Sequence, residues 1–302
     1  MPRKRKTVKP RPAAKKQKIK SKNSKRNRVN SRTGKKFNAN AFALLFLIFA
    51  VTEILGLIVA QSLLKTIQVE PVFGQTINDA SNAIYLVGMI LATTALLILL
   101  LRMKRKRNFL WIIEALAVFS TSTIVFGTII GDYSILVAIL LVLLRQMNRK
   151  KLWLRNLTCI ILIAGAGAYL GISLGTLPIL IFIIALAIYD IIAVFGTKHM
   201  VTIGKEVSEG NFAFTIAIPT KEHKFELGNG DLVVPLMVAS SIMANGPFKN
   251  NYTVAAACLL ASFIGLAISI ETVSRKKIAL PALPPQTALI LIVIAATYLL
   301  GA

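Results

Sequence analysis

The sequence predicts an all-α integral membrane protein with nine transmembrane helices, a cytosolic N-terminus and an extracytosolic C-terminus. Mean hydropathy is +0.69 and 55% of residues are hydrophobic, values typical of a multi-pass protein of the cell membrane. Nine apolar segments follow one another along the chain. The connections between them alternate between cation-rich and cation-poor, and this alternation predicts the orientation.

The first element is a basic tail over residues 1–37. Residues 1–36 hold 17 of the 36 Lys and Arg and no acidic residue, with almost no apolar content. Such a segment cannot bury a core, so we expect a disordered cytosolic tail that contacts anionic lipid headgroups. The formal charge of +24 therefore indicates a tail that fixes the membrane topology rather than a surface that binds nucleic acid. Binding of RNA or a ribosome is the alternative role of the tail.

The nine apolar segments come next. The first has 24 residues, longer than the roughly 7–15 of a signal-peptide core, and the seventh has only 14 against the roughly 20 of a full span. The segments run over residues 41–64, 82–101, 109–127, 129–144, 153–172, 177–196, 231–244, 252–271 and 281–301.

Every second connection is basic. Residues 197–229, the longest connection, carry four Lys and four Glu, and their middle part, 211–220, alternates like a short strand. The chain thus divides into the tail (1–37), spans one to six (38–200), and the loop with spans seven to nine (201–302). The other cation-rich connections are 102–107, 145–151 and 274–277, and the cation-poor ones are 65–81, 128–133, 173–176 and 245–251.

Two aspartates, Asp190 and Asp231, lie inside the hydrophobic part of the chain. A carboxylate in a bilayer is costly, which indicates a function. Two carboxyl groups that share a low-dielectric site cannot both ionise easily, so one keeps a proton. One acid and one base facing a common water are what aspartic proteolysis requires.

Segment lengths place the two carboxylates at a similar depth. Asp190 precedes Lys198 by eight residues, or roughly 12 Å along a helix. Asp231 opens the 14-residue seventh segment, which covers about 21 Å of a core about 30 Å thick and leaves about 9 Å on the inner side. Both therefore belong near the cytosolic face.

Two short motifs accompany the aspartates. Gly228 and Gly230 flank Asn229 before Asp231, and glycine permits close approach and unusual backbone angles, which at membrane depth predicts a hydrated cavity. Pro281, Ala282 and Leu283 begin a proline-rich stretch. That stretch is either a helix N-terminus, where proline is favoured, or an extended segment that offers carbonyls to a substrate.

Tyr189-Asp190, the GNGD of residues 228–231 and the PAL of residues 281–283, in spans six, seven and nine, resemble the presenilin and signal-peptide-peptidase family of intramembrane aspartic proteases. The resemblance covers the chain from about residue 38 and looks like that of an archaeal or prokaryotic presenilin-type homologue. Asn229 stands where many relatives carry an apolar residue.

The resemblance implies a presenilin-like fold and proteolysis of transmembrane helices by catalytic Asp190 and Asp231, without a metal or other cofactor. It implies that the PAL residues shape the site, and Tyr189 is a further candidate in the cavity. Loop charges favour the presenilin orientation, hence substrates with an outside N-terminus. The strand in 211–220 is expected to pair with an unwound substrate, so that proline at Phe214 and Ile216 impairs cleavage.

Other polar features receive structural interpretations. Glu53 and Glu114 lie within spans, and we expect protonated acids bonded to neighbouring helices. Residues 171–175 match GxSxG by chance, since the only histidines, His199 and His223, lie in the loop, and no HExxH is present. The series Gly165, Gly167 and Gly171 predicts close helix packing.

A second class of function stays open. Intramembrane carboxylates beside broken helices also describe proton-coupled transporters and channels, although no internal repeat is visible. Prepilin-type peptidases share GxGD, but the YD and PAL elements argue against them. The sequence leaves open whether the protein forms a homo-oligomer.

Overall fold

The computed structural model describes residues 39–66, 71, 76–102, 107–197, 211–219, 224–276 and 280–301. These residues belong to one unit, Phe37–Ala302. The predicted tail, His199, His223 and most of the loop after the sixth span lie outside the described residues.

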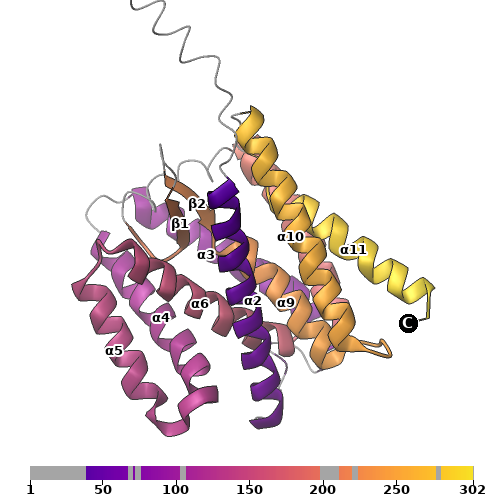
Figure 1. The fold of residues 1–302 in the computed structure, drawn as a ribbon, viewed down its shortest axis with the longest axis horizontal. Coiled ribbons are helices and arrows are strands. Elements are labelled where there is room, and N and C mark those ends of the chain that lie inside the picture. The colour runs from indigo at the N-terminus through magenta and orange to yellow at the C-terminus, as the bar shows by residue number, and fades with distance from the viewer. Residues whose placement is uncertain are drawn as a thin grey trace, which may run out of the picture. The chain divides into compact units, whose positions relative to one another are not determined.

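The described part is mostly helical, and an α-helix lies over each of the nine apolar segments (Figure 1). Most helix ends agree with the predicted segment ends within a few residues. In chain order the helices are α2 (Ala39–Thr66), α3 (Ser81–Arg102), α4 (Arg107–Ile130), α5 (Ser134–Met147), α6 (Leu152–Ile172), α7 (Thr176–Ile191), α9 (Gly230–Asn245), α10 (Asn251–Lys276) and α11 (Leu283–Leu299).

Five described stretches are long and apolar enough to cross a membrane. They lie over α2, over α4 with α5, over α6, over α7 and over α10. Shorter apolar helices cover 81–96, 230–245 and 283–299. The protein is therefore a multi-pass membrane protein.

Helix α6 lies at the centre of the bundle and packs against α2, α4 and α9. Its glycines make this possible: a Cβ added to Gly165 would lie 2.6 Å from the Thr121 carbonyl oxygen, and one on Gly171 would lie 2.6 Å from that of Met237. A Cβ on Gly167 would likewise collide with a side chain of α9. The predicted close packing through this glycine series is confirmed.

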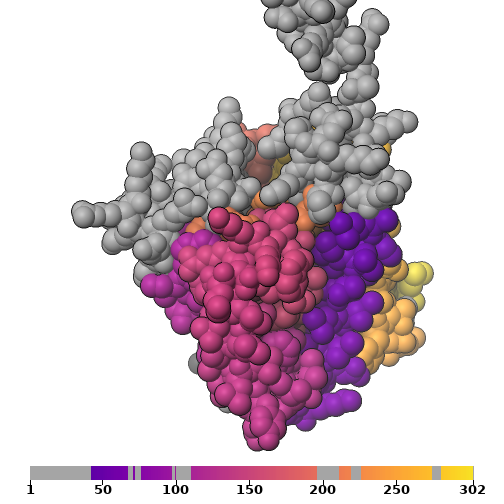
Figure 2. Space-filling view, turned by 60° about the vertical axis from the view of Figure 1, so that its left-hand side comes forward, coloured from indigo at the N-terminus to yellow at the C-terminus, as the bar shows by residue number. Residues whose placement is uncertain are grey.

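Helices α4 and α5 form a hairpin beside α2, and Figure 2 shows α2 in indigo next to this magenta pair on one face. The hairpin turns at η2 (Gly131–Tyr133), where Gly131 has a φ of 59° that glycine adopts readily. Because the turn occupies these residues, α5 begins at Ser134, later than the predicted start of the fourth segment at residue 129.

A β-hairpin precedes α9. Strand β1 (Thr215–Pro219) falls within the predicted strand region and pairs antiparallel with β2 (Lys224–Gly228), with Ala217 opposite Glu226. Ile216 and Ile218 are fully buried and pack in a cluster with residues of α2, α6 and α9. The hairpin therefore rests on the helices that surround the aspartates.

Candidate active site

Asp190 is the last residue but one of α7 and is only 5% exposed. Helix α7 is built almost entirely from Ile, Leu and Ala, and its Pro178 lies in the first turn, where an amide donor has no helical partner. The helix continues as a π-helical turn, η3 (Ile192–Thr197). Such turns interrupt helices mostly at functional sites, so the chain changes geometry directly beside Asp190.

Asp231 is the second residue of α9 and is half-buried. Free amide groups in the first turn of a helix carry partial positive charge, which stabilises a carboxylate at this position. Strand β2 ends at Gly228, so the hairpin delivers the chain directly to Asp231.

The two glycines of GNGD leave room rather than bend the backbone. Among the described residues, neither Gly228 nor Gly230 has a positive φ, and Asn229 is helical with φ −60° and ψ −29°. The positive φ that glycine permits is therefore not used at either position. A Cβ on Gly230 would meet no described atom within 4 Å, and one on Gly228 would lie 3.5 Å from Asp231 Oδ2. The space beside the carboxylate stays open.

Asn229 ties this turn to the segment before β1. Its backbone N–H donates to the Phe214 carbonyl at 3.1 Å, and its Nδ2 donates to the Ala213 carbonyl at 2.9 Å. Its own carbonyl accepts from Leu232 and Val233, which closes the first turn of α9. One side chain thus fixes the start of the helix that carries Asp231.

The structure brings the three motifs together. Helix α7 packs against both α9 and α11, and Asp190 lies close enough to Asp231 for an electrostatic interaction. The backbone N–H of Leu283 donates to Asp190 Oδ2 at 3.2 Å. Pro281 is buried and Ala282 is the N-cap residue, so the PAL stretch is a helix N-terminus placed against Asp190.

Tyr189 is half-buried and precedes Asp190 on α7. Consecutive residues of a helix point about 100° apart, so the two side chains leave the helix on different faces. Tyr189 is thus the neighbour of Asp190 in the sequence, but its side chain leaves the helix in another direction.

A buried polar network, not foreseen from the sequence, anchors the hairpin. Glu114 and Arg145 are fully buried and form an ion pair, with Nε 3.0 Å from Oε1. The same Oε1 accepts the backbone N–H of Ala213 at 2.9 Å, and Arg145 donates to the carbonyl of Asn211. Ala213 is thus held by Glu114 on one side and by Asn229 on the other.

Two side chains of helix α6 bind the β-hairpin. Arg155 donates to Glu226 Oε1 at 3.2 Å, across 71 residues of sequence. The side-chain amide of Asn156 donates to the Ala217 carbonyl at 2.8 Å and accepts the Ala217 N–H at 2.9 Å. Asn156 therefore occupies one backbone edge of β1 as a neighbouring strand would.

The expectation for the two span glutamates holds for Glu114 but not for Glu53. Glu114 bonds to a neighbouring helix, as expected, through its ion pair with Arg145 of α5. Glu53 is 2% exposed, and neither of its carboxyl oxygens has a hydrogen-bond partner among the described residues.

Comparison with known proteins agrees with this geometry. The profile of the family described as "Signal-peptide peptidase, presenilin aspartyl protease" matches residues 45–298. The fold is similar to a solved presenilin family intramembrane aspartate protease in space group C222, at TM-score 0.63 and 21% identity over 86% of this chain and 99% of that one. A second structure, in space group P2, gives TM-score 0.60 and 21% identity over 84% and 96%.

No curated protein matches the chain. The family profile spans most of its length, and the solved structures share its fold. This chain belongs to the signal-peptide peptidase and presenilin family of aspartyl proteases.

Proposed function

We propose that Asp190 and Asp231 are the catalytic pair with which this protein hydrolyses peptide bonds inside transmembrane helices of other membrane proteins. The observation that carries the proposal is their convergence: helices α7 and α9, which carry the two carboxylates, pack against each other, and the PAL stretch donates a hydrogen bond to Asp190. The match to an aspartyl protease family supports the same reaction.

The reaction needs water and one shared proton. The ionised carboxylate takes a proton from a water molecule, and the oxygen of that water attacks the scissile carbonyl carbon. The protonated carboxyl group gives its proton to the carbonyl oxygen. The resulting gem-diol collapses, the C–N bond breaks and the amine leaves with a proton. The two aspartates titrate as a unit, so neither is assigned as base or acid alone.

Leu283 has a positioning role in this scheme. Its N–H bonds Asp190 Oδ2, and the backbone N–H of Ala282 also bonds this carboxyl group, so two amides of the PAL stretch orient it. The open space over Gly230 and beside Gly228 gives a substrate backbone access to Asp231.

An unwound substrate adds to β2 rather than to β1. Backbone groups of successive strand residues point to opposite edges. Both groups of Ala217 bond Asn156, and Ala217 lies opposite Glu226, so the backbone groups of Glu226 point away from β1. This edge of β2 leads directly to Asp231, and it is where strand addition fits.

The proposed topology has nine spans, with the N-terminus cytosolic and the C-terminus outside. Its support is the alternation of loop charge together with helices over all nine apolar segments. In this arrangement the basic tail (1–37) meets anionic headgroups, residues 38–200 carry Asp190, and residues 201–302 carry Asp231 and PAL. Substrates enter with their N-terminus outside.

Cleavage by the purified protein in detergent tests the proposal. The substrate is a single-span protein with its N-terminus outside, and the enzymes are wild type, Asp190→Asn and Asp231→Asn. We expect both variants to lose at least about a hundredfold in rate while keeping the melting temperature of wild type. Survival of wild-type rates in either variant contradicts the catalytic pair. Proton flux in vesicles without any cleavage identifies the transporter alternative instead.

A further inference from the structure

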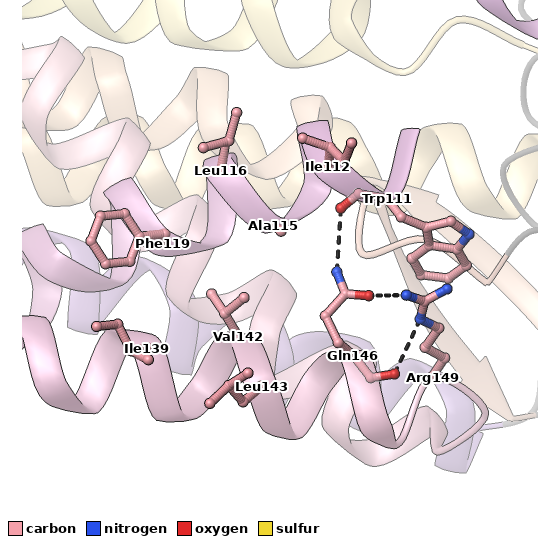
Figure 3. A pocket seen from close by; sticks show the side chains of 10 residues that line it. All are labelled: Trp111, Ile112, Ala115, Leu116, Phe119, Ile139, Val142, Leu143, Gln146 and Arg149. Carbon is pink, nitrogen blue, oxygen red and sulfur yellow. Dashed lines mark hydrogen bonds between the residues drawn. The ribbon is translucent and has the colours of Figure 1, made fainter. Parts of the chain in front are cut away.

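An apolar groove of about 560 Å³ runs between α4 and α5 (Figure 3). Its walls are Ile112, Leu116 and Phe119 on α4 and Ile139 and Leu143 on α5. Leu116 is 63% exposed and Leu143 is 53% exposed, so the groove opens outward from the bundle. In a membrane-spanning hairpin that side faces lipid.

One end of the groove is charged. The Arg149 guanidinium stacks over the Trp111 ring at 4.0 Å, and its Nε donates to the Gln146 carbonyl at 3.1 Å (Figure 3). A terminal nitrogen donates to the Gln146 side chain, whose Nε2 donates to the Trp111 carbonyl at 3.3 Å. The described contacts thus engage two of the five N–H donors of Arg149 and hold its plane at the groove mouth.

The charge around this mouth is positive. Arg149 is followed by Lys150, and the charge of Arg145, one turn earlier, is paired with Glu114. Glu114, the acid nearby, is already bonded to Arg145 and to the backbone of Ala213. The mouth therefore complements an anion, and its tryptophan is the residue type enriched where headgroups begin.

We propose that this groove binds an anionic phospholipid, with the headgroup phosphate on Arg149 and an acyl chain along α4 and α5. A guanidinium fits a phosphate through two parallel hydrogen bonds. From Trp111 to Phe119 the wall extends about 12 Å, enough for a long stretch of acyl chain. The residues of the site take no part in the proposed proteolysis.

Tryptophan quenching tests the site directly. The chain has two tryptophans, so Trp153→Phe, at a position 63% exposed, leaves Trp111 as the only tryptophan, which is excited selectively over the tyrosines. The full chain is placed in phosphatidylcholine vesicles that contain an equal fraction of either brominated phosphatidylglycerol or brominated phosphatidylcholine. We expect the anionic lipid to quench at about a fivefold lower fraction, the effect of one basic contact.

Three variants locate the preference. Arg149→Gln is expected to abolish it, whereas Lys151→Gln, at an exposed residue outside the groove lining, keeps it. Ala115→Leu fills the groove without touching Arg149 and is expected to weaken quenching by the anionic lipid.

Three results overturn the proposal. Equal quenching of the Trp153→Phe protein by both lipids shows that the site does not select charge. Quenching by neither lipid shows that a protein segment or a second copy covers the groove. Loss of the preference on addition of soluble glycerol phosphate shows a free-phosphate site rather than a lipid site. Protease assays play no part, so failure here leaves the proposed function untouched.

Discussion

At the scale of single residues, the proposed site depends on groups that act through the backbone. Asp190 is oriented by an amide of the PAL stretch, and Asp231 is placed by a turn whose only side chain, that of Asn229, bonds to the segment before β1. The glycines provide space rather than strain. Substitutions that change one hydrogen bond can therefore be separated from substitutions that change packing.

Leu283→Pro removes one donor, and it also restricts Ala282, whose φ of −91° and ψ of −27° lie in the helical region that a following proline disfavours. Leu283 is the first residue of α11, a position that favours proline. Without its N–H, Asp190 Oδ2 loses a hydrogen bond to a charged acceptor, about 1.5–3 kcal/mol, so we expect kcat/KM to fall about 10- to 100-fold. Leu283→Ala is the control, because it keeps the N–H and trims only the side chain. Equal activity of the two variants would refute the positioning role.

At the scale of elements, the β-hairpin is fixed from both sides by buried polar groups. Glu114 and Arg145 hold its entry, and Arg155 and Asn156 hold its strands. The hairpin in turn sets where α9 begins. The elements are thus arranged so that the open edge of β2 ends at the proposed catalytic pair.

Glu226→Pro tests the open edge. Proline removes a backbone N–H that points away from β1, and edge strands tolerate this change. We expect KM for a single-span substrate to rise severalfold with the hairpin intact, because one substrate hydrogen bond is lost. Glu226→Ala serves as the control, since it removes the same contacts to Arg155 and Thr215 but keeps the N–H. If the two variants have the same KM, substrates do not pair with β2.

The buried ion pair has a measurable coupling. Glu114→Met alone leaves the Arg145 charge unpaired, and we expect a loss of about 3–5 kcal/mol in the free energy of unfolding. The double variant with Arg145→Met is expected to lose less than the sum of the two single variants. Denaturant unfolding in detergent measures all four proteins, with the exposed Lys151→Met as control. Strict additivity would show that the pair does not hold the hairpin.

Much of the element scale is readable from the sequence, and the polar network is not. The lengths of the apolar segments predict the helices, and the glycine series of α6 predicts its close packing. The spacing of Asp190 and Asp231 from the loops predicts a common depth for them. Glu114 and Arg145 are 31 residues apart, so no local pattern links them. Arg145 also lies beside a basic loop, where a positive charge is expected for the membrane topology without any partner. Asn156 pairs with a strand 61 residues away and carries no local signal.

At the scale of the whole molecule, the arrangement predicts which loops face the cytosol. The two cysteines of the protein, Cys159 and Cys258, are buried, at 0% and 1% exposed, so they contribute little background labelling. Lys151→Cys is expected to resist a membrane-impermeant maleimide in intact cells and to react after lysis. Lys249→Cys, in a cation-poor connection, is expected to react in both. The reverse pattern would invert the orientation and the side from which substrates enter.

The side chain of Asn156 has a consequence beyond the positioning of β1. A two-stranded ribbon ordinarily offers two unpaired edges, and a chain of such ribbons can grow without limit into an aggregate. Here one edge already has its hydrogen bonds satisfied at Ala217. The ribbon can therefore be extended only at β2, and a second hairpin that joined there through its own β2 would leave no open edge. Two hairpins that met in a crowded membrane would stop at a closed pair instead of seeding a fibre.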